Sequence, residues 1–247
     1  MTAPVFVHPS VAEAEVGGDL WLEGPEGRHA VSVKRLRAGE EVVLTDGLGA
    51  GVRAVVAEAA GKDRLRVTVG ELLKEPEPAL TVTVVQALPK GDRGEVAVET
   101  MTETGTDTVV PWAAARCVTR WKDERGAKAL AKWRATAREA GKQSRRLRFP
   151  EVAGPLSTRQ LLPVLAAADL AVVLHEEGAE PLATTPLPES GRVVLVVGPE
   201  GGIGADELAE LTGAGARLCR LGRSVLRTST AGTAATAVLL TRSGRWN

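Results

Sequence analysis

The stretch Val193–Gly204 constrains the fold of this chain more than any other segment. It reads Val-Val-Leu-Val-Val-Gly-Pro-Glu-Gly-Gly-Ile-Gly. The five apolar residues predict a short buried strand, and the turn at 198–202 leads directly into a predicted helix over 205–211. A strand, a glycine-rich turn and a helix in this order bring backbone N–H and C=O groups against a ligand, because glycine permits positive φ and close approach. Taken alone, the turn fits a ligand cradle and a plain βα turn with an exposed Glu200 equally well.

Composition limits the class of protein without naming a function. A chain of 247 residues can form one large domain or two modest ones, and contents of 44% apolar and 25% charged residues are ordinary for a globular protein. We find no signal pattern at the N-terminus and no apolar run of membrane-spanning length, and therefore expect a cytoplasmic protein. Cys117 and Cys219 are too isolated for a disulfide framework, and the three histidines are equally scattered. We expect no metal site.

Charge is strongly segregated although the formal net charge is zero. Residues 116–148 hold 12 lysine or arginine residues against 3 aspartate or glutamate residues, a local charge of +9 that the remaining chain balances. A solvated helix face is the usual explanation of such a run. Here the basic residues outlast one helix and continue through the loop-like stretch 142–148, which favours a nucleic-acid site.

The rhythm of the sequence divides the chain into two parts. Residues 1–72 predict a small β-barrel with one short helix over 28–36; its strands are expected over 5–8, 19–22, 41–45, 52–57 and 64–71. The polar, proline-bearing stretch 73–79 predicts a linker. Residues 80–247 alternate between apolar strands and helices, which favours a largely parallel α/β sheet. The strands are expected over 81–85, 107–111, 170–174 and 193–197, and the helices over 94–104, 123–140, 157–168, 205–211 and 228–240.

Ligand sites in parallel sheets lie outside the carboxyl ends of the strands. Three such ends stand out, at 174–177, 198–202 and 221–227. The third runs into a helix of small residues over 228–240. Small residues allow another backbone to pack very closely, but on its own the pattern is better explained as a buried alanine-rich helix.

Several segments together resemble the ribosomal RNA small subunit methyltransferase E family of the SPOUT superfamily. They are 86–93 (Gln-Ala-Leu-Pro-Lys-Gly-Asp-Arg), 198–202, 221–231, 102–105, Pro111 and the stretch 133–150. Each is weak alone, but the combination in this order is specific and extends over nearly the whole chain. The family makes N3-methyluridine in 16S ribosomal RNA (rRNA).

The resemblance implies a fold, a cofactor and partners. It implies a PUA-like RNA-binding barrel over 1–72 and a SPOUT methyltransferase domain over 80–247, with a deep trefoil knot that would be an exception to the usual rule against threaded chains. S-adenosylmethionine is expected in the knot. A homodimer is expected through the knot helices, with the small-residue face of helix 228–240 as a fitting surface, so that the basic block of one subunit serves the site of the other.

The resemblance also implies site residues. The cofactor-binding residues would be Leu174, His175, Glu176, Val197, Gly198, Pro199, Glu200, Gly201, Gly202, Leu221, Gly222, Ser224, Val225, Leu226, Thr228 and Ala231. The catalytic residues would be Arg227, which stabilises negative charge on the target base, and Glu200, which accepts a proton or fixes the cofactor. A Glu200 that only caps a backbone turn remains an equally good interpretation.

RNA contacts are expected in both parts of the chain. Those of the barrel are Arg28, Lys34, Arg35 and Arg37, and those of the C-terminal domain are Lys90, Arg93, Lys132, Arg134, Arg138, Gln143, Arg145 and Arg146. The chain departs from the family pattern at two positions. Ser229 and Lys142 stand where the family commonly has acids, so a mechanism that needs a carboxylate at either place is weakened.

Three other functions remain open. A related SPOUT enzyme would methylate a ribose 2′-hydroxyl, against which the segment 88–93 argues. A phosphate-binding α/β enzyme would use the glycine turn for a nucleotide, but the turn lacks the lysine and hydroxyl residue of a P-loop. A non-catalytic RNA-binding protein of ribosome assembly would keep the fold without turnover.

Overall fold

The computed structural model describes residues 3–246 and divides the chain into two units. The N-terminal unit comprises the residues up to Glu77 together with Gly141–Phe149, and the C-terminal unit comprises Pro78–Ala140 and the residues from Pro150 onward. The N-terminal unit therefore takes one segment from inside the basic block. Each unit is described by itself.

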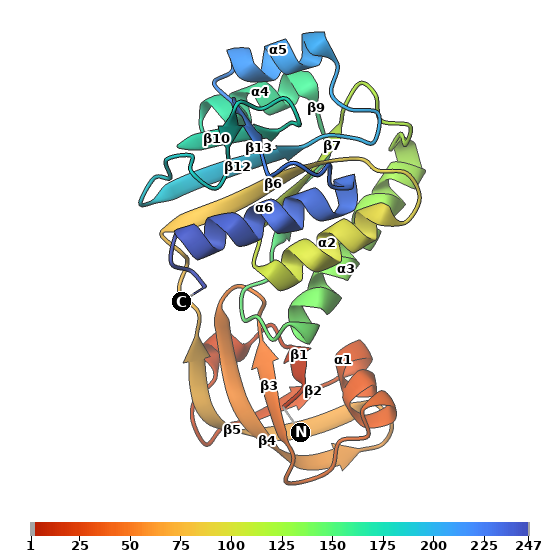
Figure 1. Ribbon diagram of the computed structural model, residues 1–247. Coiled ribbons are helices and arrows are strands. Elements are labelled where there is room, and N and C mark those ends of the chain that lie inside the picture. The colour runs from red at the N-terminus through yellow and green to blue at the C-terminus, as the bar shows by residue number, and fades with distance from the viewer. Residues whose placement is uncertain (1–2, 247) are drawn as a thin grey trace. The chain divides into compact units, whose positions relative to one another are not determined.

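The N-terminal unit is built on a five-stranded sheet whose strands run in the order β1, β3, β4, β5, β2 (Figure 1). The strands are β1 (Val5–Val7), β2 (Asp19–Leu22), β3 (Glu41–Thr45), β4 (Ala50–Ala60) and β5 (Arg64–Lys74). All neighbouring pairs are antiparallel except β1 and β3. Alternate residues of β4 and β5 are buried around Phe6, as expected of strands with one face on a core. The five predicted strands are confirmed, and β5 continues into the stretch expected as a linker.

The predicted helix over 28–36 is wrong in its bounds. A 3-10 turn, η1 (Val11–Glu13), comes first, and the helix itself is α1 (Gly24–Arg28), which passes into a π-helical turn, η2 (His29–Val33). Pro25 lies in the first turn of α1, where its missing N–H costs nothing because no partner exists there. Pro25 is therefore compatible with a helix that begins at Gly24, earlier than the predicted start at residue 28.

The segment Gly141–Phe149 packs on the hairpin end of the N-terminal sheet. The ring of Phe149 lies where a side chain on Gly47 or Gly141 would stand, and Phe149 N donates to Gly47 O at 2.8 Å. Arg148 N donates to Glu75 Oε2 at 3.0 Å. The two glycines thus make room for an aromatic ring that holds this segment in place.

The C-terminal unit contains a parallel sheet in the order β11, β13, β10, β12, β6, β7, β8, with β9 also paired to β7. Its strands are β6 (Leu80–Ala87), β7 (Thr108–Ala113), β8 (Glu151–Val152), β9 (Leu156–Ser157), β10 (Leu170–Leu174), β11 (Glu180–Pro181), β12 (Gly191–Val197) and β13 (Arg217–Arg220). Every recorded pairing in it is parallel. The predicted parallel sheet is confirmed, and the carboxyl ends of its strands share one edge.

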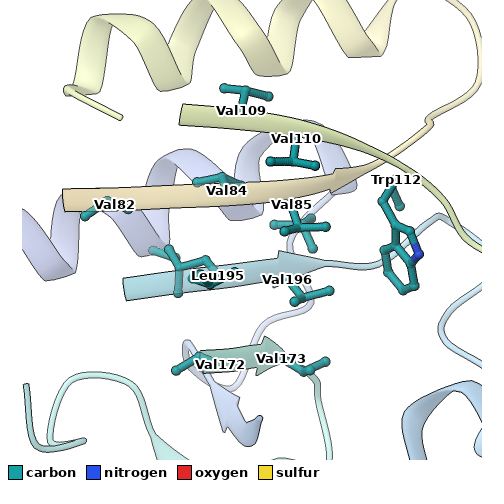
Figure 2. Close-up of a cluster of buried hydrophobic side chains, with 14 of the residues drawn as sticks. Val82, Val84, Val85, Val109, Val110, Trp112, Val172, Val173, Leu195 and Val196 are labelled. Atoms are coloured by element: carbon teal, nitrogen blue, oxygen red, sulfur yellow. The ribbon is translucent and has the colours of Figure 1, made fainter. Parts of the chain in front are cut away.

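Helices cover both faces of this sheet. They are α2 (Arg93–Thr104), α3 (Asp123–Gln143), α4 (Thr158–Ala166), α5 (Ala205–Gly213) and α6 (Thr228–Arg242). In Figure 1, α2 and α6 lie on one face and α4 and α5 on the other. Figure 2 shows the consequence: neighbouring residues of β6, β7, β10 and β12, most of them valine, are buried and belong to one hydrophobic cluster. Strands covered on both faces are expected to be apolar throughout.

The small residues of α6 are used inside the chain. Gly232 lies so close to Met101 of α2 that an added Cβ would be 2.7 Å from its sulfur. The hydroxyls of Thr100 and Thr233 are 2.7 Å apart, and those of Thr106 and Thr236 are 3.2 Å apart. Close packing of α2 against α6 therefore accounts for much of the small-residue pattern that had suggested a subunit interface.

Substituting Gly94, in the first turn of α2, tests a tight contact. An added Cβ would be 2.5 Å from the indole of Trp133, which also packs edge-on against Trp121. We expect Gly94→Ala to lower the free energy of unfolding by about 1–3 kcal/mol through overpacking, measured by urea denaturation. Gly213→Ala is the matched control, because nothing lies within 4 Å of its Cβ position. Equal midpoints for the two variants would contradict this reading of the contact.

Candidate active site

The sheet order brings the three predicted strand ends to one edge. β12 is central, with β10 and β13 on one side and β6 and β7 on the other. The loop after β10 adjoins the end of β13, because His175 N donates to Cys219 O at 2.9 Å. A Cβ on Gly178 would lie 2.7 Å from the backbone of Cys219, so glycine is required where these loops cross.

The glycine turn after β12 is closed by its own backbone. Gly202 has φ of 70° and donates its N–H to Pro199 O at 2.9 Å. Glycine adopts this left-handed conformation at no steric cost. The turn thus has a defined shape, and the N–H groups of Glu200 and Gly201 have no hydrogen-bond partner among the described residues.

A buried chain of hydrogen bonds joins the turn to β6 and α6. Thr228 Oγ1 donates to Gly198 O at 2.7 Å and accepts from Gln86 Nε2 at 3.1 Å. Both side chains are buried. Gln86 Oε1, in contrast, is one of three buried side-chain atoms without a partner in residues 3–246. Buried acceptors are nearly always paired in native proteins, so this oxygen is suited to accept a bond from a ligand.

The loop between β13 and α6 supplies further backbone groups. In the part of the chain that the structure describes, residues 221–226 form no backbone hydrogen bond, and Val225 is 77% exposed. Unpaired backbone groups next to a helix start and a glycine turn are available to a bound molecule.

The two predicted catalytic residues differ in their surroundings. Arg227 directly precedes Thr228, so its backbone lies at the junction of β6, β12 and α6. Its exposed guanidinium has no hydrogen bond or ion pair among residues 3–246. Glu200 is engaged: its Oε1 accepts from Lys90 N at 3.2 Å and lies 3.8 Å from Arg93 Nη1. This geometry favours Glu200 as a clamp on the loop after β6.

The predicted RNA-binding residues fall into four groups, of which three are described first. Arg28, Lys34, Arg35 and Arg37 are exposed on α1 and the turns that follow it. Lys90 and Arg93 lie beside the glycine turn. On α3, Lys132 pairs with Glu95 at 3.0 Å, Arg134 donates to Val152 O at 3.0 Å, and Arg138 is exposed.

Gln143, Arg145 and Arg146, predicted as RNA contacts of the C-terminal domain, are grouped differently by the contacts in the structure. These residues belong to the N-terminal unit, because the segment that carries them is packed there through Phe149 and Glu75. Sequence proximity to α3 had suggested otherwise.

Some residues at this edge were not predicted. Arg116 Nη1 donates to Gly201 O at 3.2 Å, and the buried carboxylate of Glu207 accepts from Ala115 N at 3.0 Å. Gln86 had a readable signal, a polar residue at the end of an apolar strand. The contacts of Arg116 with Gly201 and of Ala115 with Glu207 join residues 85 and 92 positions apart, so no local sequence pattern predicts them.

Thiol and metal chemistry find little support at this edge. Burial raises the pKa of the Cys117 and Cys219 thiols, which keeps both protonated near neutral pH and poor as nucleophiles. Among residues 3–246, no three His, Cys, Asp or Glu side chains gather in a way that would hold a metal ion. A separate question is whether the chain could span a membrane. Within residues 3–246, no helix has the length and apolarity needed to cross one.

The hydroxyl of Thr228 offers a direct test of the buried chain. Thr228→Val keeps the shape but leaves the Gln86 amide and Gly198 O without this partner, at an expected cost of about 1–3 kcal/mol in thermal unfolding. Thr230→Val removes an exposed hydroxyl from the same helix turn and should stay within about 0.5 kcal/mol of the unsubstituted protein. Equal losses of stability in the two variants would mean that the buried hydrogen bonds of Thr228 do not stabilise the fold more than an exposed hydroxyl does.

Comparison with family models gives two matches. Residues 75–240 match the model of an RNA methyltransferase domain, and residues 22–70 match that of an RNA methyltransferase PUA domain. Together these matches span most of the chain, with one match in each part.

Individual proteins resemble the whole chain. The ribosomal RNA small subunit methyltransferase E of Mycobacterium bovis is 46% identical over 94% of this chain and 90% of its own length. The protein of the same name from Bacillus subtilis is 30% identical over 92% and 91%. The crystal structure of a ribosomal RNA small subunit methyltransferase E from Neisseria gonorrhoeae, bound to S-adenosyl methionine, matches with a TM-score of 0.85 and 27% identity over 98% of each chain.

Proposed function

Since the chain belongs to the ribosomal RNA small subunit methyltransferase E family, we propose that it methylates N3 of a uridine in 16S rRNA with S-adenosylmethionine as methyl donor. It is an rRNA methyltransferase with a PUA-like N-terminal domain and a C-terminal SPOUT domain. The observation that carries the proposal is the edge of the parallel sheet, where unpaired backbone groups of two loops meet the start of α6.

The residues at this edge fit the cofactor. When bound, S-adenosylmethionine supplies a methyl group activated by a sulfonium. The loops after β10, β12 and β13 offer backbone donors and acceptors, which suit the hydroxyls and ring nitrogens of a nucleoside, and Gln86 Oε1 adds a buried acceptor. The residues proposed to hold it are Leu174, His175, Glu176, Val197–Gly202, Leu221, Gly222, Ser224, Val225, Leu226, Thr228 and Ala231.

Arg227 has the chemistry that the target base requires. Uracil N3 carries a proton near neutral pH, so negative charge develops on the base as that proton leaves. A guanidinium fixed beside the base stabilises this charge without reorganisation of solvent. Arg227, whose backbone lies at the junction of β6, β12 and α6, has an exposed guanidinium without a partner among residues 3–246, and it is the proposed catalytic residue.

Glu200 acts in this proposal through the residues it holds. Its contacts with Lys90 N and the Arg93 guanidinium fix the loop after β6 next to the glycine turn. A carboxylate engaged in this way orients basic groups toward RNA more readily than it accepts a proton. We therefore assign Glu200 as a positioning residue.

A knot, a dimer and a cytoplasmic location complete the proposal. From the end of β13 the chain passes to Thr228, which bonds to β12 and β6 on the far side of β10. This path supports the trefoil knot expected of the fold. The exposed loop 221–226 and the outward residues of α6 are available for the partner subunit, and rRNA is the macromolecular partner.

Two measurements test the function in sequence. Titration calorimetry with S-adenosylmethionine should show binding, and transfer of labelled methyl groups to small ribosomal subunits or 16S rRNA should follow. Binding without transfer to either substrate would favour a non-catalytic assembly protein. An absence of cofactor binding would exclude the methyltransferase.

A further inference from the structure

Arg116 lies against the glycine turn on a side that the cofactor loops do not occupy. Its Nη1 donates to Gly201 O at 3.2 Å, and its side chain lies within 4 Å of the Cβ positions of Gly201, Gly202 and Gly204. It follows β7, and β7 and β6 lie on the opposite side of β12 from β10 and β13. Side chains on these three glycines would come into van der Waals contact with the arginine.

The loop that carries Arg116 is fixed from several directions. Ala115 N donates to Glu207 Oε1 at 3.0 Å, and that carboxylate, 7% exposed, also accepts from the Thr158 hydroxyl. The Arg120 guanidinium donates to Ala114 O at 3.0 Å and to Ala115 O at 2.9 Å. A loop pinned through both its N–H and its C=O groups presents the next side chain in a defined direction.

The same loop is tied to the loop after β6. Thr119 Oγ1 donates to Pro89 O at 2.7 Å, next to Lys90. Lys90, Arg93 and Arg116 therefore form a cationic rim on one side of the glycine turn. Within the rim, Arg93 faces the carboxylate of Glu200, whereas Arg116 contacts only a neutral carbonyl.

The guanidinium of Arg116 retains most of its binding capacity. It has five N–H donors, of which one hydrogen bond is formed among residues 3–246. An exposed, preoriented guanidinium is suited to bind a phosphate with two parallel hydrogen bonds. The buried Glu207, which the proposed mechanism does not use, holds its backbone in place.

We propose that Arg116 binds a backbone phosphate of the substrate RNA beside the target uridine, and that Glu207 is the residue that positions it. The inference rests on the proposed function. It assigns RNA, and not the cofactor carboxylate, as the ligand because Arg116 follows β7, on the opposite side of β12 from β10 and β13 and from the cofactor loops that follow those two strands.

The test compares Arg116→Ala with Arg125→Ala, which removes an equal charge from an exposed position on α3. We expect Arg116→Ala to raise KM for 16S rRNA about tenfold or more, to leave kcat and the Kd for S-adenosylmethionine near their original values, and to reduce the salt slope of RNA binding by about one. Arg116→Lys should restore the slope but only part of the KM, because lysine lacks the planar fork. Arg125→Ala should change none of these quantities.

Glu207→Gln tests the positioning role. The amide keeps the size but weakens the bond from Ala115 N, so KM for rRNA should rise less than in Arg116→Ala while the affinity for S-adenosylmethionine stays the same. The melting temperature verifies that the variant is folded, and a Glu207→Asp variant serves if it is not.

Two results would overturn the inference: an equal salt slope in Arg116→Ala and Arg125→Ala, or a loss of affinity for S-adenosylmethionine in Arg116→Ala. The second would place Arg116 in the cofactor site. RNA binding is measured without turnover, so a protein that fails to transfer methyl groups would refute the proposed function while the salt slopes still decide the role of Arg116.

Discussion

Replacing Arg227 with alanine should lower kcat for rRNA methylation about 10²–10³-fold, the usual effect of removing a group that stabilises charge in the transition state. The Kd for S-adenosylmethionine should remain near its original value, because the residues proposed to hold the cofactor from this segment act mainly through backbone. Single-turnover methyl transfer and titration calorimetry measure the two quantities separately. The position of Arg227 directly before Thr228, with an exposed guanidinium that has no partner among residues 3–246, is the structural basis of this expectation.

Arg223→Ala is the matched control. Arg223 is exposed in the same loop and carries the same charge, but it lies five positions before Thr228, the first residue of α6, whereas Arg227 directly precedes it. Its kcat should stay close to the wild-type value. If the two variants lose activity equally, the loop contributes only general positive charge and Arg227 has no catalytic role.

Replacing Lys142 with alanine should lower the free energy of unfolding by about 3–5 kcal/mol, because it removes one partner of a mostly buried ion pair. Lys142 Nζ lies 3.2 Å from Glu26 Oε1, and the two side chains are only 4% and 14% exposed. Glu26 also accepts from Val7 N at 3.4 Å. Urea denaturation of the full chain measures the loss.

A charge exchange separates pairing from packing. Lys142→Glu alone should be at least as damaging as Lys142→Ala, whereas Lys142→Glu combined with Glu26→Lys should recover much of the stability. Lys128→Ala is the control, since its pair with Glu124 is 80% and 91% exposed and contributes less than about 1 kcal/mol. A Lys142 variant no less stable than the Lys128 variant would refute the importance of the buried pair.

The contact with Glu26 also shows where the charge of Lys142 is used. A carboxylate at position 142 would face Glu26 within the N-terminal unit. The lysine charge is instead paired with Glu26. Part of the basic block identified in the sequence thus stabilises the fold and is not available to RNA.

Periodicity predicted most of the fold correctly. The apolar runs of β10 and β12 and the alternation in β4 and β5 follow directly from burial on two faces or one. The placement of Gly141–Phe149 was not predictable, because it depends on a ring that packs against Gly47, far away in the sequence. α1 begins earlier than predicted because its first turn accommodates Pro25.

The site was predictable in its motifs and unpredictable in its contacts. The glycines at 198, 201 and 202 predict a turn whose backbone can approach a ligand closely. Whether Glu200 acts on a proton or on a neighbouring loop depends on Lys90 N, and that proximity arises only when β6 and β12 pair. The role of Arg116 likewise depends on a buried carboxylate from α5.

The most direct test of the central claim is mass-spectrometric analysis of 16S rRNA after incubation of small ribosomal subunits with the protein and labelled S-adenosylmethionine. We predict a single labelled product, 3-methyluridine, whose formation falls steeply with Arg227→Ala. Two results would contradict uridine-N3 methylation by this protein. One is label on a ribose 2′-hydroxyl, and the other is unlabelled 16S rRNA although the protein binds the cofactor.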